Sequence, residues 1–349
     1  MAWLWTMNVV ARADRALACV MVIGLCGAPA VAQQPRETAF YAGKTIVLYA
    51  GQPAGGGIDS EMRLVGQFIG RFIPGEPIVQ PRNMPGAGGV TLGNYLYSSV
   101  PADGLTLAMP GRAGFVLAPI GDDKSARYDV RKFTWIGSAA STNFIFWTRN
   151  TSGLKTIADL RALKREMAIA GSGATTSNSI MPEVLARYER FPFKIVRGYP
   201  GMAAAVLSVE RGETEGVYCD RASMRPDMVS SGLVSPLFQT FDQEPGVPVI
   251  DTLLSDPRER ELVALLTTPM RLGLALIGPP DMPAEQTTIL REAYGRMVRD
   301  PAYQEEAKRR GFDIGKPNAG EELAAYLGKT ISGLSPEVIA EYRSFIERK

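Results

Sequence analysis

The segment GQPAGGGIDS, residues 51–60, restricts the fold most, because it places three consecutive glycines between two different apolar patterns. The run Thr45–Ala50 before it is almost entirely apolar, which is typical of a buried strand. Asp59–Ile73 after it carries apolar residues at helical spacing, which is typical of an amphipathic helix. The helical stripe comprises Met62, Val65, Phe68, Ile69 and Phe72. The segment therefore predicts a strand, a glycine loop and a helix in succession.

The same succession recurs along the chain, with glycine loops at Gly86–Gly89 and Gly171–Ser177 and a turn at Tyr199–Gly201. Alternating strands and helices predict an α/β fold with mainly parallel sheets that are covered on both faces. Ligands bind such sheets beyond the carboxyl ends of the strands, which is where the glycine loops lie. The other predicted elements are strands Ile78–Gln80, Leu105–Met109, Met167–Ala170, Lys194–Val196, Gly216–Cys219 and Leu272–Ile277, helices Leu92–Ser99, 178–188 and Ala203–Glu210, and a largely helical region from Ala284 onward.

The amino-terminal segment has the organisation of a secretory leader. Arg12 and Arg15 precede an apolar run at Ala16–Gly27, and Ala30-Val31-Ala32 supplies the small residues that a signal peptidase needs. The apolar run is too short to span a bilayer stably. We therefore expect residues 1–32 to be a signal peptide that is cleaved after Ala32, and the mature protein to be periplasmic.

Residue usage narrows the classes of function. The chain has no histidine, which excludes Ser-His-Asp and Cys-His catalysis and almost every ordinary zinc site. Beyond the predicted leader, Cys219 is the single cysteine, so the mature chain forms no internal disulfide. A formal net charge of +2 gives no reason to expect a nucleic-acid partner. We expect no metal and no cofactor, and a binding protein is favoured over an enzyme.

The glycine loops do not complete a nucleotide-binding motif. Residues 51–60 lack the Lys-Ser/Thr pair of a P-loop, and neither Gly86–Thr91 nor Gly171–Thr176 completes G-x-G-x-x-G. Glycines nonetheless let consecutive amides face one concavity, and a following helix adds the positive end of its dipole. Two such loops at one strand edge suit a single carboxylate. A tight turn with close packing is the alternative explanation for each loop.

Several motifs occur in order between Tyr41 and Lys349: PAGGGID (53–59), NMPGAGG (83–89), ADGLTLAMPGR (102–112), GSGATTS (171–177), GYPG (198–201) with ERGETEG (210–216), and GPPDMPAE (278–285). This set resembles the periplasmic substrate-binding proteins of tripartite tricarboxylate transporters, the Bug family. The resemblance implies a two-lobed flytrap, a periplasmic-binding-protein fold like type II, with two mainly parallel sheets joined by two hinge crossovers. It also implies a protein that closes on a small organic carboxylate and delivers it to membrane permease subunits.

The resemblance implies a binding site as well. In that family the first two loops hold a ligand carboxylate through backbone amides, partly through ordered water, and the second lobe supplies loops for the distal end. The corresponding residues here are Gln52, Ala54, Gly55, Gly56 and Asp59 in the first loop, Asn83, Gly86, Ala87 and Gly88 in the second, and Ser172, Thr175 and Thr176 in the opposing lobe. The sequence departs from the commoner family pattern at two places: Gly51-Gln52 stand where Pro-Phe is usual, and Met84 stands where Arg is frequent. The identity of the family's ligands is therefore not transferred to this chain.

Single side chains near strand ends add three candidates. Arg112 follows the strand Leu105–Met109 and could hold a carboxylate in a bidentate fork. Asp220 could orient a ligand hydroxyl or amine, and Tyr199 could form part of the cleft wall. Each has a structural alternative, respectively a surface arginine, an ion pair and a packed aromatic ring. Asp59 is expected to cap the helix that begins there.

Two crossovers are expected to join the lobes, one near Trp135–Trp147 and one at residues 269–276. They predict a first lobe of residues 33–140 and 273–349, which includes the carboxyl-terminal helices, and a second lobe of residues 141–272. A ligand that touches both lobes would favour the closed form. We expect a monomer.

Two other functions stay open at this point. A secreted hydrolase or isomerase could use Asp59 or Asp220 as a base, with a raised carboxylate pKa. A signalling receptor would present the closed flytrap to a sensor protein instead of a permease. The sequence separates neither transport from sensing nor one small acid from another.

Overall fold

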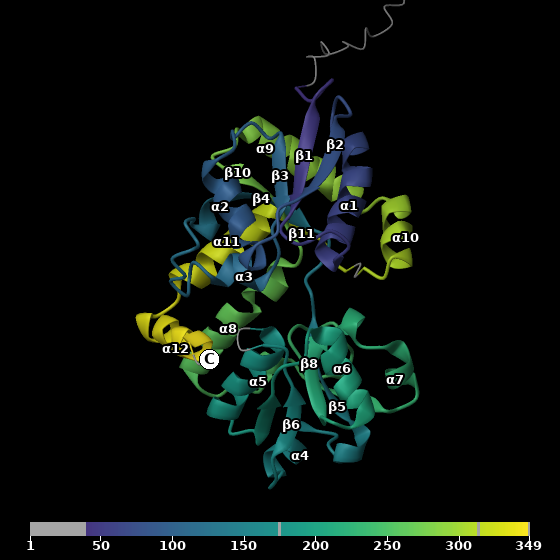
Figure 1. The fold of residues 1–349 in the computed structure, drawn as a ribbon, viewed down its shortest axis with the longest axis vertical. Helices are drawn as coiled ribbons and strands as arrows, with labels where there is room; N and C mark the ends of the chain where they lie inside the picture. The colour runs from purple at the N-terminus through teal and green to yellow at the C-terminus, as the bar shows by residue number, and fades with distance from the viewer. Residues whose placement is uncertain (1–39, 174–175, 313–314, 348–349) are drawn as a thin grey trace, which may run out of the picture. The chain divides into compact units, whose positions relative to one another are not determined.

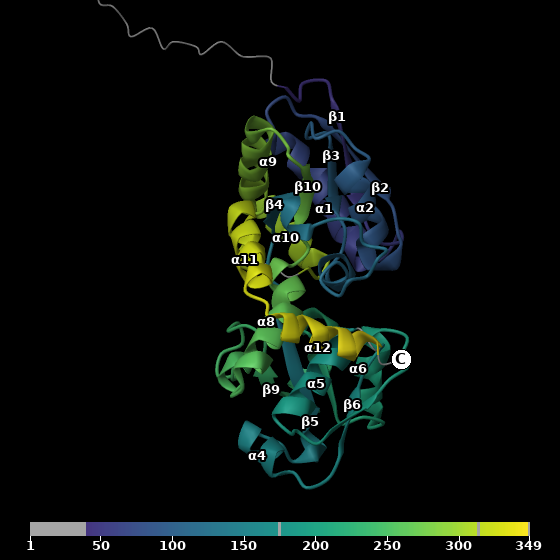
Figure 2. The same ribbon diagram turned by 90° about the vertical axis from the view of Figure 1, so that its left-hand side faces the viewer.

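The computed structural model describes residues 40–173, 176–312 and 315–347, and the predicted signal peptide lies outside them. In this part of the chain the strands form two sheets, with helices packed against them (Figures 1 and 2). The α/β class expected from the sequence is confirmed. None of the described helices is both long enough and apolar enough to cross a membrane.

The first sheet has the strand order β11-β4-β10-β3-β1-β2. β1 pairs in parallel with β2 and with β3, so Ala50, Asn83 and Met109, the last residues of these strands, lie at one edge. β10 runs antiparallel between β3 and β4. The bounds are β1 Thr45–Ala50, β2 Ile78–Asn83, β3 Thr106–Met109, β4 Phe133–Ser138, β10 Leu276–Pro280 and β11 Asn318–Ala319.

The second sheet has the order β7-β6-β8-β5-β9. β6 pairs in parallel with β7 and β8, whereas β5 is antiparallel to both of its neighbours. The expected parallel pairing therefore holds for the βα repeats. β5 and β10 are the strands next to the crossovers. Each enters its sheet from the direction of the other sheet and therefore runs antiparallel to its neighbouring strands. The bounds are β5 Phe144–Arg149, β6 Met167–Ala170, β7 Phe193–Val196, β8 Gly216–Asp220 and β9 Val234–Gln239.

The helices bury one apolar face each, as α1 illustrates. Met62, Val65 and Phe68 of its predicted stripe are buried in the core beside β1. The helix bounds are α1 Gly57–Ile69, α2 Val90–Ser98, α3 Ala113–Leu117, α4 Ile157–Ala162, α5 Ser177–Tyr188, α6 Met202–Arg211, α7 Pro226–Ser230, α8 Pro257–Leu272, α9 Ala284–Met297, α10 Pro301–Arg309, α11 Gly320–Ser332 and α12 Pro336–Glu347. Short 3-10 turns are η1 Gly70–Phe72, η2 Ala87–Gly89, η3 Val130–Lys132, η4 Asn150–Ser152, η5 Arg221–Ser223 and η6 Ile250–Thr252.

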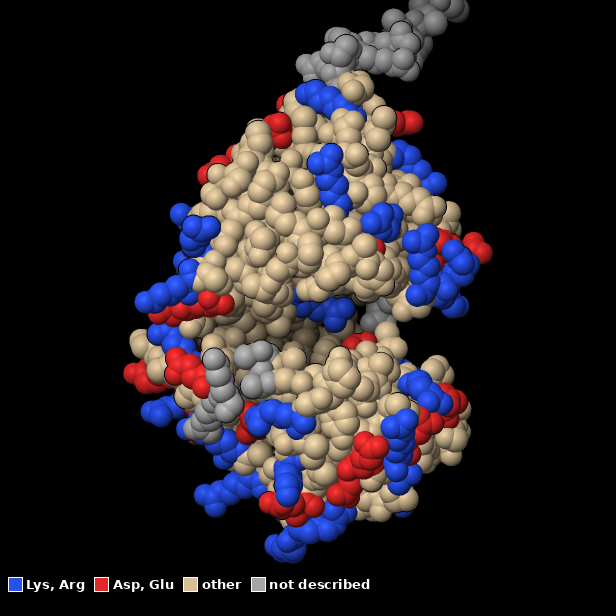
Figure 3. All heavy atoms as spheres, in the orientation of Figure 1, with Lys and Arg blue, Asp and Glu red and all other residues tan. Residues whose placement is uncertain are grey.

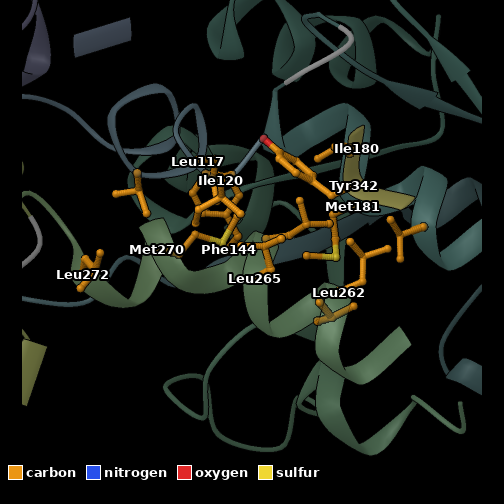
Figure 4. Close-up of a cluster of buried hydrophobic side chains, with 14 of the residues drawn as sticks. Leu117, Ile120, Phe144, Ile180, Met181, Leu262, Leu265, Met270, Leu272 and Tyr342 are labelled. Carbon is orange, nitrogen blue, oxygen red and sulfur yellow. The ribbon is translucent and has the colours of Figure 1, made fainter. Parts of the chain in front are cut away.

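The largest apolar cluster contains residues of both sheets, because α8 connects them. α8 packs against α3 and α11 on one side and against α5 and α12 on the other. Figure 4 shows Leu262, Leu265 and Met270 of α8 beside side chains from α3, α5 and α12. Two further clusters lie on the outer sides of the first and the second sheet. Cys219 belongs to the latter, and its full burial confirms that it is a small buried hydrophobe.

The predicted strand Leu272–Ile277 is partly wrong. α8 continues through Pro269 to Leu272, and β10 begins only at Leu276. The helix ends at Gly273, where φ is +64° and where an added Cβ would lie 2.1 Å from the carbonyl oxygen of Ala140. This glycine, rather than the proline, terminates the helix, since only a residue without a side chain fits there.

The last helix departs from the expectation that residues 273–349 stay with the first sheet. Glu341 of α12 accepts a hydrogen bond from the hydroxyl of Tyr188 and lies 3.1 Å from Arg187, and both of these residues belong to α5. Figures 1 and 2 both draw α12 beside α5 and α8. α12 therefore packs on helices that cover the second sheet.

A buried carboxyl in α8 makes stability depend on pH. The side chain of Glu259 is fully buried, and this burial, together with the nearby Glu189 carboxylate, raises its pKa from 4.5 to about 8. The folded state therefore keeps a proton that the unfolded chain releases above about pH 4.5. The stabilisation is complete below that pH and is lost as the pH rises through about 8.

We expect the free energy of unfolding, measured with urea between pH 5 and pH 8, to fall with rising pH in the wild type and to change much less in Glu259→Gln. Glutamine resembles the protonated acid and does not titrate. Glu305→Gln, which changes an exposed carboxylate, is the control and should keep the wild-type slope. Parallel curves for all three proteins would contradict the assignment.

Candidate functional site

Three loops of the first sheet meet at the carbonyl oxygen of Pro110. A Cβ added to Gly51, after β1, would lie 2.0 Å from that oxygen, and one added to Gly89, after β2, would lie 2.1 Å from it. Pro110 itself follows β3. Such distances are far below van der Waals contact, so only glycine allows this approach. For Gly51 and Gly89 the alternative explanation, close packing, is therefore correct.

Asp59 holds the first loop in place. Its Oδ2 accepts a hydrogen bond from the amide of Gly55 at 2.8 Å, and its Oδ1 accepts one from Nδ2 of Asn83 at 2.8 Å. Nε of Arg63 donates to both oxygens at 3.0 Å. Asn83 Nδ2 also donates to the carbonyl of Gln52 at 2.9 Å. One carboxylate thus connects the loop after β1, the helix α1 and the end of β2.

Asp59 is not the helix cap that the sequence predicts. α1 begins at Gly57 and its N-cap is Gly56, so Asp59 is the third helical residue and reaches back to the loop. Burial raises its pKa, but the hydrogen bonds from Arg63, Gly55 and Asn83 outweigh this and lower it to about 2. A carboxylate with so low a pKa is a weak base, which disfavours Asp59 as a general base.

The second loop presents amides at the same edge. η2 begins at Ala87, so the amides of Ala87 and Gly88 lie in its first turn. Amides in the first turn of a helix have no preceding carbonyl within the helix to accept a hydrogen bond from them. Gly88 has φ +64°, and its carbonyl lies against α3, where a Cβ on Gly114 would approach it to 2.7 Å. Gly86 packs against Thr91, and its carbonyl oxygen accepts a hydrogen bond from the amide of Gly89. The loop therefore has a fixed shape with two amides at its start.

Arg112 and Asp220 line one small cavity of about 80 Å³ together with Glu61, Thr142 and Phe312. Nε of Arg112 is buried, and no hydrogen-bond partner for it lies among the described residues. Asp220 caps η5 instead, since it accepts bonds from the amide of Ser223 at 3.0 Å and from its hydroxyl at 2.8 Å. The structure thus brings Arg112 to the site with donor capacity left over.

The loop after β6 is held by its own side chains. Asn178 donates to the hydroxyl of Ser172 at 2.9 Å, and its carbonyl oxygen accepts a bond from Thr176 at 2.6 Å. Thr176 also donates to the carbonyl of Gly173 at 2.7 Å. Thr175, which the sequence also indicates, lies outside the described residues.

A larger cavity of about 540 Å³ joins the loops that follow β2 and β6. Ala87 and Gly88 line it from one side and Thr176 from the other, and side chains of α3 and α12 complete the wall. The volume of this cavity suits a small organic molecule.

Figure 3 shows that the displayed face of the molecule is hollowed near its middle, with basic and acidic atoms visible inside the hollow.

A second large cavity, of about 600 Å³, lies against α9 and β11 and is lined by Arg291, Lys316 and Glu321. It contains none of the predicted site residues and is not at the carboxyl ends of β1, β2 and β3. We therefore place the candidate site at the loops.

The predicted site residues that the structure describes divide into four groups. Ala87, Gly88, Arg112, Thr176 and Asp220 line the two cavities. Gln52, Asp59, Asn83, Gly86 and Ser172 shape the loops through the contacts above, while Ala54, Gly55 and Gly56 are exposed on the first loop. Tyr199 packs partly against the outer core of the second sheet.

Sequence reasoning missed Glu61, Thr142, Asn178, Tyr342 and Ile346. Asn178 directly follows the GSGATTS motif, and this position could have indicated it. Tyr342 and Ile346 carry no local signal, because only the packing of α12 brings them to the cavity.

Comparison with known proteins assigns the family. Residues 73–331 match the model for the tripartite tricarboxylate transporter family receptor, TctC. The chain belongs to the TctC family. No curated protein matches the sequence.

Solved structures support the two-lobed fold of this TctC-family receptor. A TctC solute-binding protein from Polaromonas, without ligand, has a TM-score of 0.69 at 17% identity and covers 88% of this chain and 100% of its own. MatC from Rhodopseudomonas palustris, with bound malate, has a TM-score of 0.56 at 16% identity over 87% and 99% of the two chains. Another R. palustris protein, with adipate, has a TM-score of 0.57 at 17% identity over 86% and 98%. The predicted periplasmic-binding-protein fold is thereby confirmed.

Paired glycine variants test the packing at Pro110. We expect Gly51→Ala to destabilise the protein by roughly 1–3 kcal/mol, because its Cβ would overlap the Pro110 carbonyl. Gly57→Ala, at the first residue of α1, is the control, since nothing lies within 4 Å of its added Cβ, and it should be neutral or slightly stabilising. Urea unfolding measures both, and equal effects would refute the packing account.

Proposed function

We propose that this TctC-family protein is the periplasmic solute receptor of a tripartite tricarboxylate transporter and that it captures a small organic carboxylate. The ligand lies at the carboxyl ends of β1, β2 and β3 and is released to the membrane permease subunits. The leader, residues 1–32, is cleaved after Ala32, and the receptor acts as a monomer.

The observation that carries this proposal is the buried Nε of Arg112, which has no hydrogen-bond partner in the part of the chain that the structure describes. A buried donor without a partner costs free energy comparable to a lost hydrogen bond, so it favours an acceptor from elsewhere. A carboxylate matches a guanidinium fork in charge and geometry. The same edge carries the amides of Ala87 and Gly88, which are donors without side-chain bulk.

The proposed ligand contacts are those expected from the sequence. Arg112 and the second loop hold the carboxylate, and the first loop, Gln52–Asp59, supplies amides and fixed shape. Ser172, Thr175, Thr176, Tyr199 and Asp220 face the ligand from the lobe of residues 141–272. The other lobe comprises residues 33–140 and the chain from 273, although α12 packs across to α5 and α8.

The relatives support a carboxylate. Two structures of the same fold contain malate and adipate, which are both dicarboxylates. Binding without chemical change is the proposed activity, because Asp59 has a pKa of about 2 and Asp220 is engaged by Ser223. Asp59 therefore lacks the raised pKa that the hydrolase or isomerase hypothesis requires.

Thermal unfolding of the mature protein against a panel of mono-, di- and tricarboxylates tests the function. A ligand at 100 times its dissociation constant stabilises the folded state by about 2.7 kcal/mol. We expect at least one acid class to raise the melting temperature and the bound acid to be recovered unchanged.

Arg112→Gln should weaken that binding by about 1.5–3 kcal/mol, the contribution of hydrogen bonds from a charged donor. Arg127→Gln, which changes an exposed arginine, is the control and should bind as the wild type does. The proposal fails if no acid stabilises the folded protein or if the acid is converted.

A further inference from the structure

The carboxyl-terminal helix forms one wall of the larger cavity. Tyr342 and Ile346 of α12 face that cavity, and Leu117 and Ala118, at the end of α3, lie on the same wall. A Cβ on Gly121 would lie 3.0 Å from Cδ1 of Ile346, so α12 also packs directly on the turn after α3. The cavity wall is therefore built from two segments that are more than 200 residues apart.

This wall is apolar. Figure 4 shows Leu117, Ile120 and Tyr342 above the leucines of α8, with the Tyr342 hydroxyl pointing away from them. Asp123 is the charged side chain that the described wall contains, and it is exposed. The part of a solute that contacts this wall is removed from water and packs against carbon atoms. This burial is favourable for apolar groups, so the wall favours an apolar solute.

Tyr342 adds a polar handle to the wall. Its side chain is only 5% exposed. Burial raises its pKa to about 12, so it stays protonated and can donate. The hydroxyl can therefore donate a hydrogen bond to a polar atom of a solute in this cavity.

The charges around the two cavities oppose a solute with several carboxylates. Arg112 lines the smaller cavity together with the acidic Glu61 and Asp220, and Asp123 lines the larger one. Among the described residues, the larger cavity is lined by one carboxylate and by no lysine or arginine. Arg112 can pair with one carboxylate of a solute, whereas a second carboxylate in the larger cavity would meet Asp123 and no described cationic side chain.

We propose that α12 is the specificity wall of the site, and that the solute is a monocarboxylic acid with an apolar aliphatic or aromatic body. Arg112 lines the smaller cavity and Ala113, the next residue, lines the larger one, so the two cavities are neighbours. The carboxylate is held by Arg112 and by the amides of Ala87 and Gly88, and the body lies in the larger cavity against Leu117 and Ile346. This inference rests on the proposed function and narrows it, since the relatives with malate and adipate hold dicarboxylates.

α12 is held firmly enough to act as a wall. Glu341 is bound by Tyr188 and Arg187 of α5, and the Ser335 amide before the helix donates to Glu261 of α8. On the other side, Arg343 lies 3.9 Å from Asp122 in the turn after α3. The helix therefore contacts both segments that the cavity separates.

The first test compares acids on the mature wild-type protein. Benzoate, phenylacetate and 4-methylpentanoate represent apolar monocarboxylates, and succinate, malate and citrate represent polycarboxylates. We expect at least one of the first set to raise the melting temperature more than every member of the second set. The inference is overturned if a polycarboxylate is the best ligand, and the proposed function fails as well only if no acid binds.

The second test uses matched variants of α12 and calorimetric affinity for the best monocarboxylate. Ile346→Asn should weaken binding about tenfold or more, because an amide replaces an apolar contact. Ile339→Asn makes the same change two turns earlier at another half-buried position that does not line this cavity, and it should leave affinity unchanged. Equal affinities for the two variants overturn the inference.

Tyr342→Phe removes only the hydroxyl. It should lower affinity roughly three- to tenfold, as expected for one hydrogen bond, while the urea midpoint stays that of the wild type. An unchanged affinity would remove Tyr342 from the site.

Discussion

The approach of two glycines to the Pro110 carbonyl is the constraint on which the site depends. Gly51, Gly89 and Pro110 follow three neighbouring strands, and any side chain at the glycines would push the loops apart. The sheet brings the strand ends together, and this contact fixes how their loops pack. The amides of Ala87 and Gly88 then have a defined position at the start of the second loop. Backbone packing, rather than a set of polar side chains, gives the site its shape.

Two charged side chains at this edge have opposite roles. The carboxylate of Asp59 is fully engaged by Gly55, Arg63 and Asn83, so it stabilises the loop. Arg112 keeps a buried donor without a partner among the described residues. The difference follows from hydrogen bonding: a satisfied group maintains structure, whereas an unsatisfied one favours a ligand. Because the carboxylate of Asp59 is engaged by these donors, it is compatible with the binding of an anion nearby.

Much of the fold could be predicted from local sequence. β1, β6 and the end of α5 fall at the predicted residues, because apolar period and glycine punctuation are local signals. The return to the first sheet was misplaced, since Pro269 continues a helix whose end depends on packing of Gly273 against Ala140. The loops and Arg112 could be located from strand ends. The role of Asp59 could not be predicted, because its partner Asn83 lies at the end of a different strand. The contribution of α12 could not be predicted either, because it depends entirely on tertiary packing.

A single solute carboxylate paired with Arg112 is the central claim. The most direct measurement compares, by calorimetry on the wild-type protein, the affinity for the best acid with that for its carboxamide, which has nearly the same shape and no charge. The account predicts that the amide binds more than about a hundredfold more weakly, because the guanidinium and the loop amides lose their anionic acceptor. Similar affinities for the acid and its amide would contradict it.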